Sequence, residues 1–145
     1  MPRPAPYRLS PAAYPHSQPI QTRFQDMDVL GHLNNVAFAA LFETGRTKFN
    51  GQAKLWGREA RNRRAVVAQM EINYLAEGHY PDDVEIATGI GEIGNRSWQI
   101  LATMFQGGQP IATCDVVIVM DKDEGGNGLP DQFKAELAKW LVRAD

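Results

Sequence analysis

The hydrophobic period in the middle of this chain changes from that of a helix to that of a strand, and this change limits the folds open to it. From Val36 the sequence reads Val-Ala-Phe-Ala-Ala-Leu-Phe, apolar at almost every position. A helix that is apolar nearly all round is typical of a buried helix rather than a surface one. We expect Asn34 or Asn35 to be its N-cap and Gly51 to be a C-terminal stop.

After a polar connection at 57–64, apolar residues alternate with polar ones in three successive runs, which predicts strands. Gly107-Gly108 is typical of a tight hairpin, and the run 111–120 is apolar on both faces around Asp115. Residues 19–26 predict a first strand with Ile20, Thr22 and Phe24 on one side. The alternating apolar positions are Ala68, Met70, Ile72 and Tyr74, then Val84, Ile86 and Thr88, then Trp98, Ile100, Ala102 and Met104.

A short C-terminal helix follows, with Phe133, Leu137, Trp140 and Leu141 on one stripe. Consecutive strands joined by short connections favour antiparallel pairing. A long apolar helix beside such a sheet needs to be wrapped by it. The sequence therefore predicts an α+β fold in which an antiparallel sheet curls around one long buried helix.

Residues 18–145 are predicted to form this single domain, and residues 1–17 an N-terminal tail. Six of the nine prolines lie in the first 20 residues. Such a segment lacks amide donors and favours extended backbone, so we expect the tail to be extended or poorly ordered. A partner-binding arm is the alternative.

Composition excludes several classes of function. The net charge of -2 gives no basic field for nucleic acid. One cysteine excludes an internal disulfide and a multi-cysteine metal site, and three scattered histidines offer no ligand spacing, so we expect no metal and no cofactor. No apolar run is long enough to span a membrane, and no secretory h-region is present, so a cytoplasmic protein is expected.

The densest group of chemically competent side chains lies at 26–35, directly before the buried helix: Asp26, Asp28, His32, Asn34 and Asn35. The first turn of a helix has unpaired N–H groups and partial positive charge, which can stabilise an oxyanion. A carboxylate a few residues upstream can act on the same carbonyl as base or nucleophile. This combination suits acyl transfer. The alternative is that these residues are only turn and cap residues.

The run Asp-Met-Asp-Val-Leu-Gly-His-Leu-Asn-Asn at 26–35, followed by Glu43 and Arg46, resembles the hotdog-fold acyl-CoA thioesterases of the 4-hydroxybenzoyl-CoA thioesterase type. The resemblance covers about residues 19–141 and implies hydrolysis of an acyl-CoA thioester. It implies Asp28 as the catalytic carboxylate and the backbone N–H of Asn35 as the oxyanion donor. It also implies a homodimer, often paired into a homotetramer, with active sites at the dimer interface.

Plant-type acyl-carrier-protein thioesterases show a similar spacing, which Asp28, His32, Asn34 and Asn35 match, although Leu30 stands where that pattern has an asparagine. His32 would orient Asp28 or the attacking water, or contact substrate. The alternative is a structural histidine at the helix start.

Four further side chains are candidate substrate contacts besides Asn34. Phe38 is a candidate for the acyl pocket, and Ser97 for the acyl or pantetheine channel by analogy with the family. Arg63 and Arg64 end the one basic run, and arginines pair well with the phosphates of coenzyme A. A solvated loop is the alternative for that run.

Three other functions compete with an acyl-CoA thioesterase. They are a thioesterase for acyl-carrier protein, a hotdog hydratase or dehydratase, and a non-catalytic protein that binds acyl thioesters. Fold alone does not separate them, whereas the motif around Asp28 favours the thioesterase.

Overall fold

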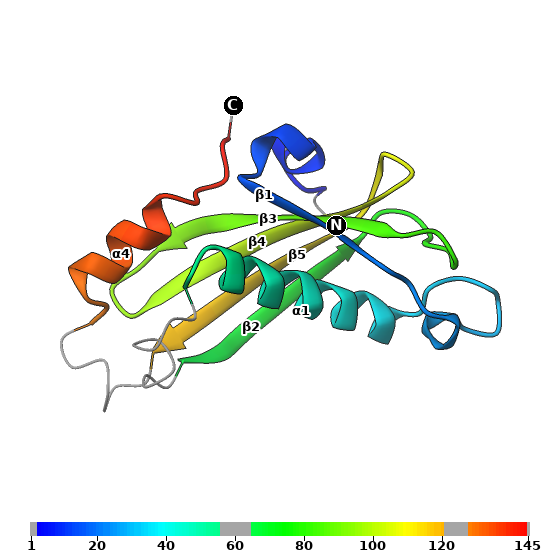
Figure 1. The fold of residues 1–145 in the computed structure, drawn as a ribbon, viewed down its shortest axis with the longest axis horizontal. Coiled ribbons are helices and arrows are strands. Elements are labelled where there is room, and N and C mark those ends of the chain that lie inside the picture. The colour runs from blue at the N-terminus through cyan, green and yellow to red at the C-terminus, as the bar shows by residue number, and fades with distance from the viewer. Residues whose placement is uncertain (1–2, 56–64, 121–127, 145) are drawn as a thin grey trace.

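A computed structural model describes residues 3–55, 65–120 and 128–144. It contains one long helix, a five-stranded sheet and a short C-terminal helix (Figure 1). The strands are β1 (His16–Ile20), β2 (Ala65–Tyr74), β3 (Val84–Ile93), β4 (Ser97–Gln106) and β5 (Gln109–Met120). The helices are α1 (Asn35–Gln52) and α4 (Asp131–Ala138), with short 3-10 turns η1 (Pro6–Leu9), η2 (Pro11–Ala13) and η3 (Phe24–Asp26).

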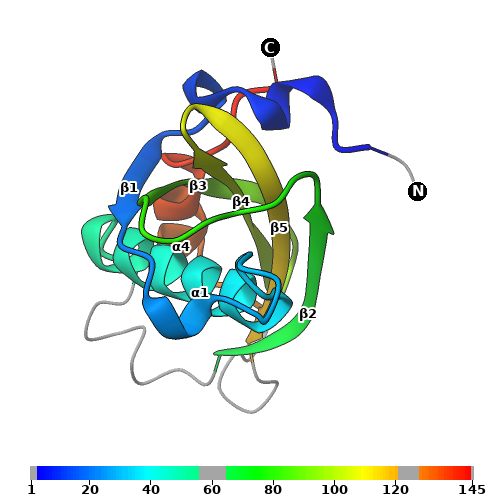
Figure 2. The ribbon, with the colours of Figure 1, turned by 90° about the vertical axis from the view of Figure 1, so that its right-hand side faces the viewer.

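The sheet has the order β1-β3-β4-β5-β2, and every pair of neighbouring strands is antiparallel. β2 and β3 are consecutive in the chain but are not neighbours, because β2 pairs with β5 at the far edge. The connection at 75–83 therefore crosses from one side of the sheet to the other. The sheet curls around α1, which lies in its concave face (Figure 2). The predicted α+β architecture is confirmed.

The start of α1 follows directly from local chemistry. Asn34 is the N-cap, and its side-chain oxygen accepts a hydrogen bond of 2.7 Å from the N–H of Ala37. The helix passes through Gly51 and ends one residue later, so the predicted stop is nearly right. The expectation that this helix is buried nearly all round is wrong, because Val36 is 72% exposed and only one side of α1 faces the sheet.

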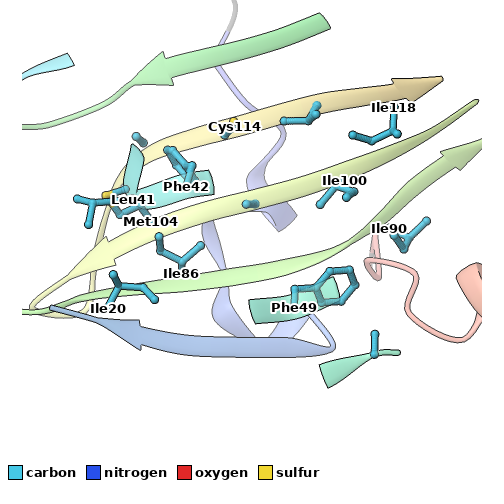
Figure 3. Packing of buried hydrophobic residues seen from close by; sticks show 14 of the residues in the cluster. Ile20, Leu41, Phe42, Phe49, Ile86, Ile90, Ile100, Met104, Cys114 and Ile118 are labelled. Carbon is cyan, nitrogen blue, oxygen red and sulfur yellow. The ribbon is translucent and has the colours of Figure 1, made fainter. Parts of the chain in front are cut away.

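The buried side of α1 packs on the inner face of the strands (Figure 3). Gly45 allows this close approach, since a Cβ there would lie 2.8 Å from Cγ2 of Ile86. This close contact is with a side chain and not with backbone. The labelled core residues come from α1, from β1 and from the inward positions of β3, β4 and β5: Ile20, Leu41, Phe42, Phe49, Ile86, Ile90, Ile100, Met104, Cys114 and Ile118.

α4 closes one end of this core. Leu137 is fully buried, and the ring of Phe133 packs edge-on against Trp98 with centroids 5.1 Å apart. Trp140 packs in the same way against Phe49. Leu141 is largely exposed, so three of the four residues of the predicted stripe face the core.

The first strand differs from its prediction. β1 begins at His16 and ends at Ile20, and the chain then makes the turn η3, so Phe24 is 72% exposed instead of sharing a face with Ile20. Pro19 lies within β1, where it is tolerated because β1 is an edge strand.

Residues 6–14, which we call the outer segment, form two 3-10 turns on the convex face of the sheet and not an extended or poorly ordered tail. Arg8 is the physical reason. Its guanidinium is buried, lies 2.8 Å from Oδ1 of Asp115, and donates to the carbonyl of Ala102 and to the hydroxyl of Tyr14. Burial lowers the pKa of Arg8, whereas the bonds to Asp115 and Tyr14 raise it, and the pKa is raised overall.

Candidate functional site

The loop that carries the sequence motif is tied at both ends. Asp26 is 3% exposed, and its carboxylate accepts hydrogen bonds from the backbone and side chain of Arg23. Its carbonyl accepts from the N–H of Asn34 at 2.9 Å, and Met27 and Leu33 form a β-bridge. Asp26 is therefore a structural residue that closes the base of the loop.

Asp28 stands at the exposed tip of this loop, where backbone N–H groups later in the loop fix its side chain. Its Oδ1 accepts hydrogen bonds from the N–H of Leu30 at 2.9 Å and of His32 at 3.2 Å. Its N–H donates to the carbonyl of His32 at 2.8 Å, and Gly31 makes the turn with a φ of +83°. An aspartate held in this way has an oriented carboxylate that solvent still reaches.

His32 is half-buried between the Asp28 loop and the connection that follows β2. Its Nε2 lies 3.1 Å from Oε2 of Glu77, and its ring packs edge-on against His79 with centroids 5.3 Å apart. The sequence motif contains no signal for Glu77. It comes into contact because the connection 75–83 crosses beside the motif loop, where the N–H of Leu33 donates to the carbonyl of Gly78.

Asn34 and Asn35 lie at the start of α1, as predicted. The side-chain oxygen of Asn34 serves as the cap by accepting from Ala37, while its NH2 group keeps two hydrogen-bond donors. Asn35 is the first helical residue and is exposed. The N–H groups of a first helical turn have no preceding carbonyl within the helix, so the amide of Asn35 can serve an anion from outside.

The other predicted contacts are more scattered. Phe38 is buried three residues into α1 and packs edge-on against Tyr74, with centroids 5.2 Å apart. Ser97 begins β4 and lines a pocket of about 310 Å³ with Trp98 and Val117. At the opposite end of β4, the side chain of Gln106 bonds to the backbone of His79 in the connection beside His32. Within one protomer, Ser97 and Asp28 therefore lie near opposite ends of β4. Arg63 and Arg64 fall outside the described residues.

Other groups in the described part of the chain offer less chemistry. Burial raises the pKa of the single thiol, Cys114, to about 11, as expected for a core residue and not a nucleophile. Residues 3–55, 65–120 and 128–144 contain no cluster of histidine, cysteine and acidic side chains suited to hold a metal. No helix among them is long and apolar enough to cross a membrane.

The comparison with solved structures supports one class of protein. A predicted thioesterase from Bacillus stearothermophilus is 30% identical, with 88% of this chain and 96% of that chain covered and a TM-score of 0.76. A thioesterase from Thermus thermophilus, solved in complex with coenzyme A and zinc, is 26% identical over 88% of this chain and 95% of that chain, with a TM-score of 0.75. A Pseudomonas aeruginosa protein is 26% identical over 92% of this chain and 96% of that chain, with a TM-score of 0.78. No curated protein sequence matches significantly.

The curled antiparallel sheet, the helix inside it and these similarities define a hotdog-fold protein of the thioesterase class. The model of the Thioesterase-like superfamily matches residues 22–141, and the chain belongs to that family. The resemblance inferred from the sequence is thereby confirmed. Membership supports the hydrolysis of a thioester, and the matched range includes the whole of the Asp28 loop and of α1.

Proposed function

We propose that this protein hydrolyses an acyl-CoA thioester to the free acid and coenzyme A, with Asp28 as the catalytic carboxylate. The observation that carries the proposal is the pair of bonds on Oδ1 of Asp28, which fix a solvent-accessible carboxylate directly before the first turn of α1. A carboxylate can supply the base or nucleophile, and a helix N-terminus the oxyanion donor, for hydrolysis of an activated acyl donor.

The chemistry assigns one role to each of these groups. Asp28 either attacks the thioester carbonyl itself or removes a proton from the water that does so. The carbonyl oxygen becomes negative, and the amide of Asn35 donates to it with help from the helix dipole. The C–S bond then breaks and coenzyme A leaves as a thiolate that takes up a proton. By direct attack, the product on Asp28 is a mixed anhydride, which water cleaves to the acid and the free carboxylate.

We also propose that the working unit is a homodimer or a homotetramer in which two chains complete each site. β2 is an edge strand and exposes four apolar side chains: Val66, Val67, Met70 and Tyr74. An exposed apolar edge is a template for pairing with another strand, and natural monomers usually protect it. A partner related by a two-fold axis would also bring the Ser97 end of one chain toward the Asp28 end of the other.

The preference for coenzyme A is supported by the thioesterase from Thermus thermophilus, which was solved with that ligand. Arg63 and Arg64 are the proposed contacts to its phosphates, and Phe38 is the proposed wall of the acyl site. Hydrolysis of an acyl-carrier-protein thioester is the alternative, because the carrier changes the binding surface and not the reaction. The cytoplasmic location stays a prediction.

The test is release of free thiol from a panel of acyl-CoA esters, from acetyl to palmitoyl with benzoyl and phenylacetyl, for the native protein beside Asp28→Asn. We expect the variant to fold normally and to lose at least about 100-fold in kcat, the scale of one positioned base. Asp83→Asn is the matched control, since Asp83 is also an exposed loop aspartate, and it should keep native rates. Native rates in Asp28→Asn would refute the assignment.

Two other outcomes point to the alternatives. Hydrolysis of acyl-carrier-protein substrates alone would change the substrate class and leave the site unchanged. Binding of acyl-CoA with no hydrolysis of either kind of thioester would favour a non-catalytic binding protein. Light scattering tests the assembly, and a stable active monomer would contradict a site shared between chains.

A further inference from the structure

Glu77 holds the imidazole of His32 from outside the sequence motif, and the contact fixes which ring nitrogen carries hydrogen. Nε2 of His32 lies 3.1 Å from Oε2 of Glu77. A carboxylate oxygen this close attracts an N–H and repels a lone pair, so the contact favours the hydrogen on Nε2. In the neutral ring the hydrogen therefore resides on Nε2, and Nδ1 is left with a free lone pair. The tautomer of a histidine is commonly set by the partner of its other nitrogen in this way.

The backbone around Glu77 is anchored well enough to aim its side chain. The side chain of Gln106 accepts from the N–H of His79 at 2.9 Å and donates to the carbonyl of His79 at 2.7 Å. It also donates to the carbonyl of Asp82, which accepts from the hydroxyl of Thr22 as well. The segment that presents Glu77 is thus fixed to the end of β4 and to the segment after β1.

His32 in turn is tied to Asp28 through its backbone. Its N–H donates to Oδ1 of Asp28 at 3.2 Å, and its carbonyl accepts from the N–H of Asp28 at 2.8 Å. The groups that face the His32 ring are Glu77 and the ring of His79, while Asp28 lies on the backbone side. The backbone of His32 is therefore part of the hydrogen-bonded turn that orients the Asp28 carboxylate.

We propose that Glu77 is a positioning residue for thioester hydrolysis, which acts through His32 by holding its imidazole as the Nε2–H tautomer and so leaving Nδ1 as an acceptor. The proposal rests on the proposed function, since it assigns His32 to the same site. An imidazole in this state can hold a water or a substrate hydroxyl by its Nδ1 lone pair. Glu77 is mostly exposed, so its role is orientation and not stability.

The first test is independent of turnover. Nitrogen-15 chemical shifts of the His32 ring at neutral pH report which nitrogen is protonated. We expect a protonated Nε2 and an unprotonated Nδ1 in the native protein. The pattern should move toward a mixture of tautomers in Glu77→Ala and stay native in Glu77→Gln, whose amide oxygen still accepts from Nε2. An unchanged pattern in Glu77→Ala would overturn the proposal.

The second test is a double-mutant cycle on acyl-CoA hydrolysis. We expect Glu77→Ala to lower kcat about 10-fold with little change in KM, within the range for coupled neighbouring residues. The same substitution in a His32→Ala background should change kcat less than about twofold, and Glu77→Gln should restore most of the rate. Glu136→Ala is the matched control, because Glu136 is a glutamate in a surface ion pair with Lys139, and it should have no effect.

The two tests separate this proposal from the proposed function. An equal loss in the native and His32→Ala backgrounds would show that Glu77 does not act through His32, even if Asp28 is confirmed as catalytic. If no thioester is hydrolysed by the native protein, the proposed function fails and the catalytic role of Glu77 fails with it. The tautomer measurement still decides in that case whether Glu77 sets the state of His32.

Discussion

Two glycines of α1 offer matched positions that test how tightly this helix packs on the sheet. A Cβ at Gly45 would lie 2.8 Å from Cγ2 and 3.1 Å from Cβ of Ile86, which is fully buried. A Cβ at Gly51, further along the same helix, would meet nothing within 4 Å. The substitutions Gly45→Ala and Gly51→Ala are therefore chemically identical changes that differ in packing.

The expected magnitudes follow from two opposing effects. Alanine in place of glycine stabilises a helix interior by up to about 1 kcal/mol, and less near the end, where Gly51 lies. Overpacking a filled core costs about 1–3 kcal/mol, and Ile86 is β-branched, so its contacting atoms cannot rotate away freely. We expect Gly45→Ala to lower the free energy of unfolding by about 0.5–2 kcal/mol. Gly51→Ala should leave it unchanged or raise it by at most about 1 kcal/mol.

The assay is urea unfolding followed by circular dichroism, with the midpoint and the m-value fitted for each variant. The double variant Gly45→Ala with Ile86→Ala gives a further check, since removal of Cγ2 should make the alanine at 45 stabilising relative to Ile86→Ala alone. The reasoning is refuted if Gly45→Ala is as stable as Gly51→Ala at an unchanged m-value. That result would mean that α1 can shift away from β3 at no cost.

Two other perturbations probe buried polar groups. Burial lowers the pKa of His16, against a smaller opposing effect of Glu85. The imidazole of His16 therefore takes up a proton at a higher pH in the unfolded chain than in the folded one. The stability that neutral His16 contributes is complete above about pH 6.5 and is lost as the pH falls below it. Unfolding by urea at pH 7.5 and 5.5 should show this loss, and His16→Gln should reduce it; an unchanged pH dependence in the variant would contradict the assignment. Arg8→Met removes the partner of the half-buried Asp115 and should cost about 1–3 kcal/mol, whereas native stability in the same measurement would show that the outer segment adds nothing to folding.

Features that depend on a few neighbouring residues could be predicted from the sequence. The cap at Asn34 follows from its side chain, which accepts a hydrogen bond from the first turn of α1. The hairpin at Gly107-Gly108 follows from two glycines that both adopt positive φ. The alternation of apolar residues also placed the inward face of β4 correctly. In each case the local rule and the tertiary fold favour the same conformation.

Features that depend on distant residues could not be predicted. Proline content constrains the backbone of residues 6–14, but the structure of this segment depends on Arg8 reaching Asp115 on β5. The pairing of β2 with β5 instead of β3 is likewise a property of the whole sheet. Within the candidate site, the motif located Asp28, His32 and Asn35, whereas Glu77 comes from a connection that approaches only in the folded chain.

The convex face of the sheet is covered by pieces from both ends of the described chain. The outer segment meets the end of the chain after α4, where the N–H of Arg143 donates to the carbonyl of Ala13 at 2.8 Å. Val142 packs there beside Leu101 and Phe105. These pieces are far apart in sequence, so closing them together has the highest loop-closure entropy in the molecule. They form a natural unit of local opening, which native-state hydrogen exchange would detect as a shared, lower protection of residues 8, 13, 14 and 142–143 while α1 and the inner core stay closed. Each such opening exposes the outward apolar side chains of β4, Leu101 and Phe105, to solvent.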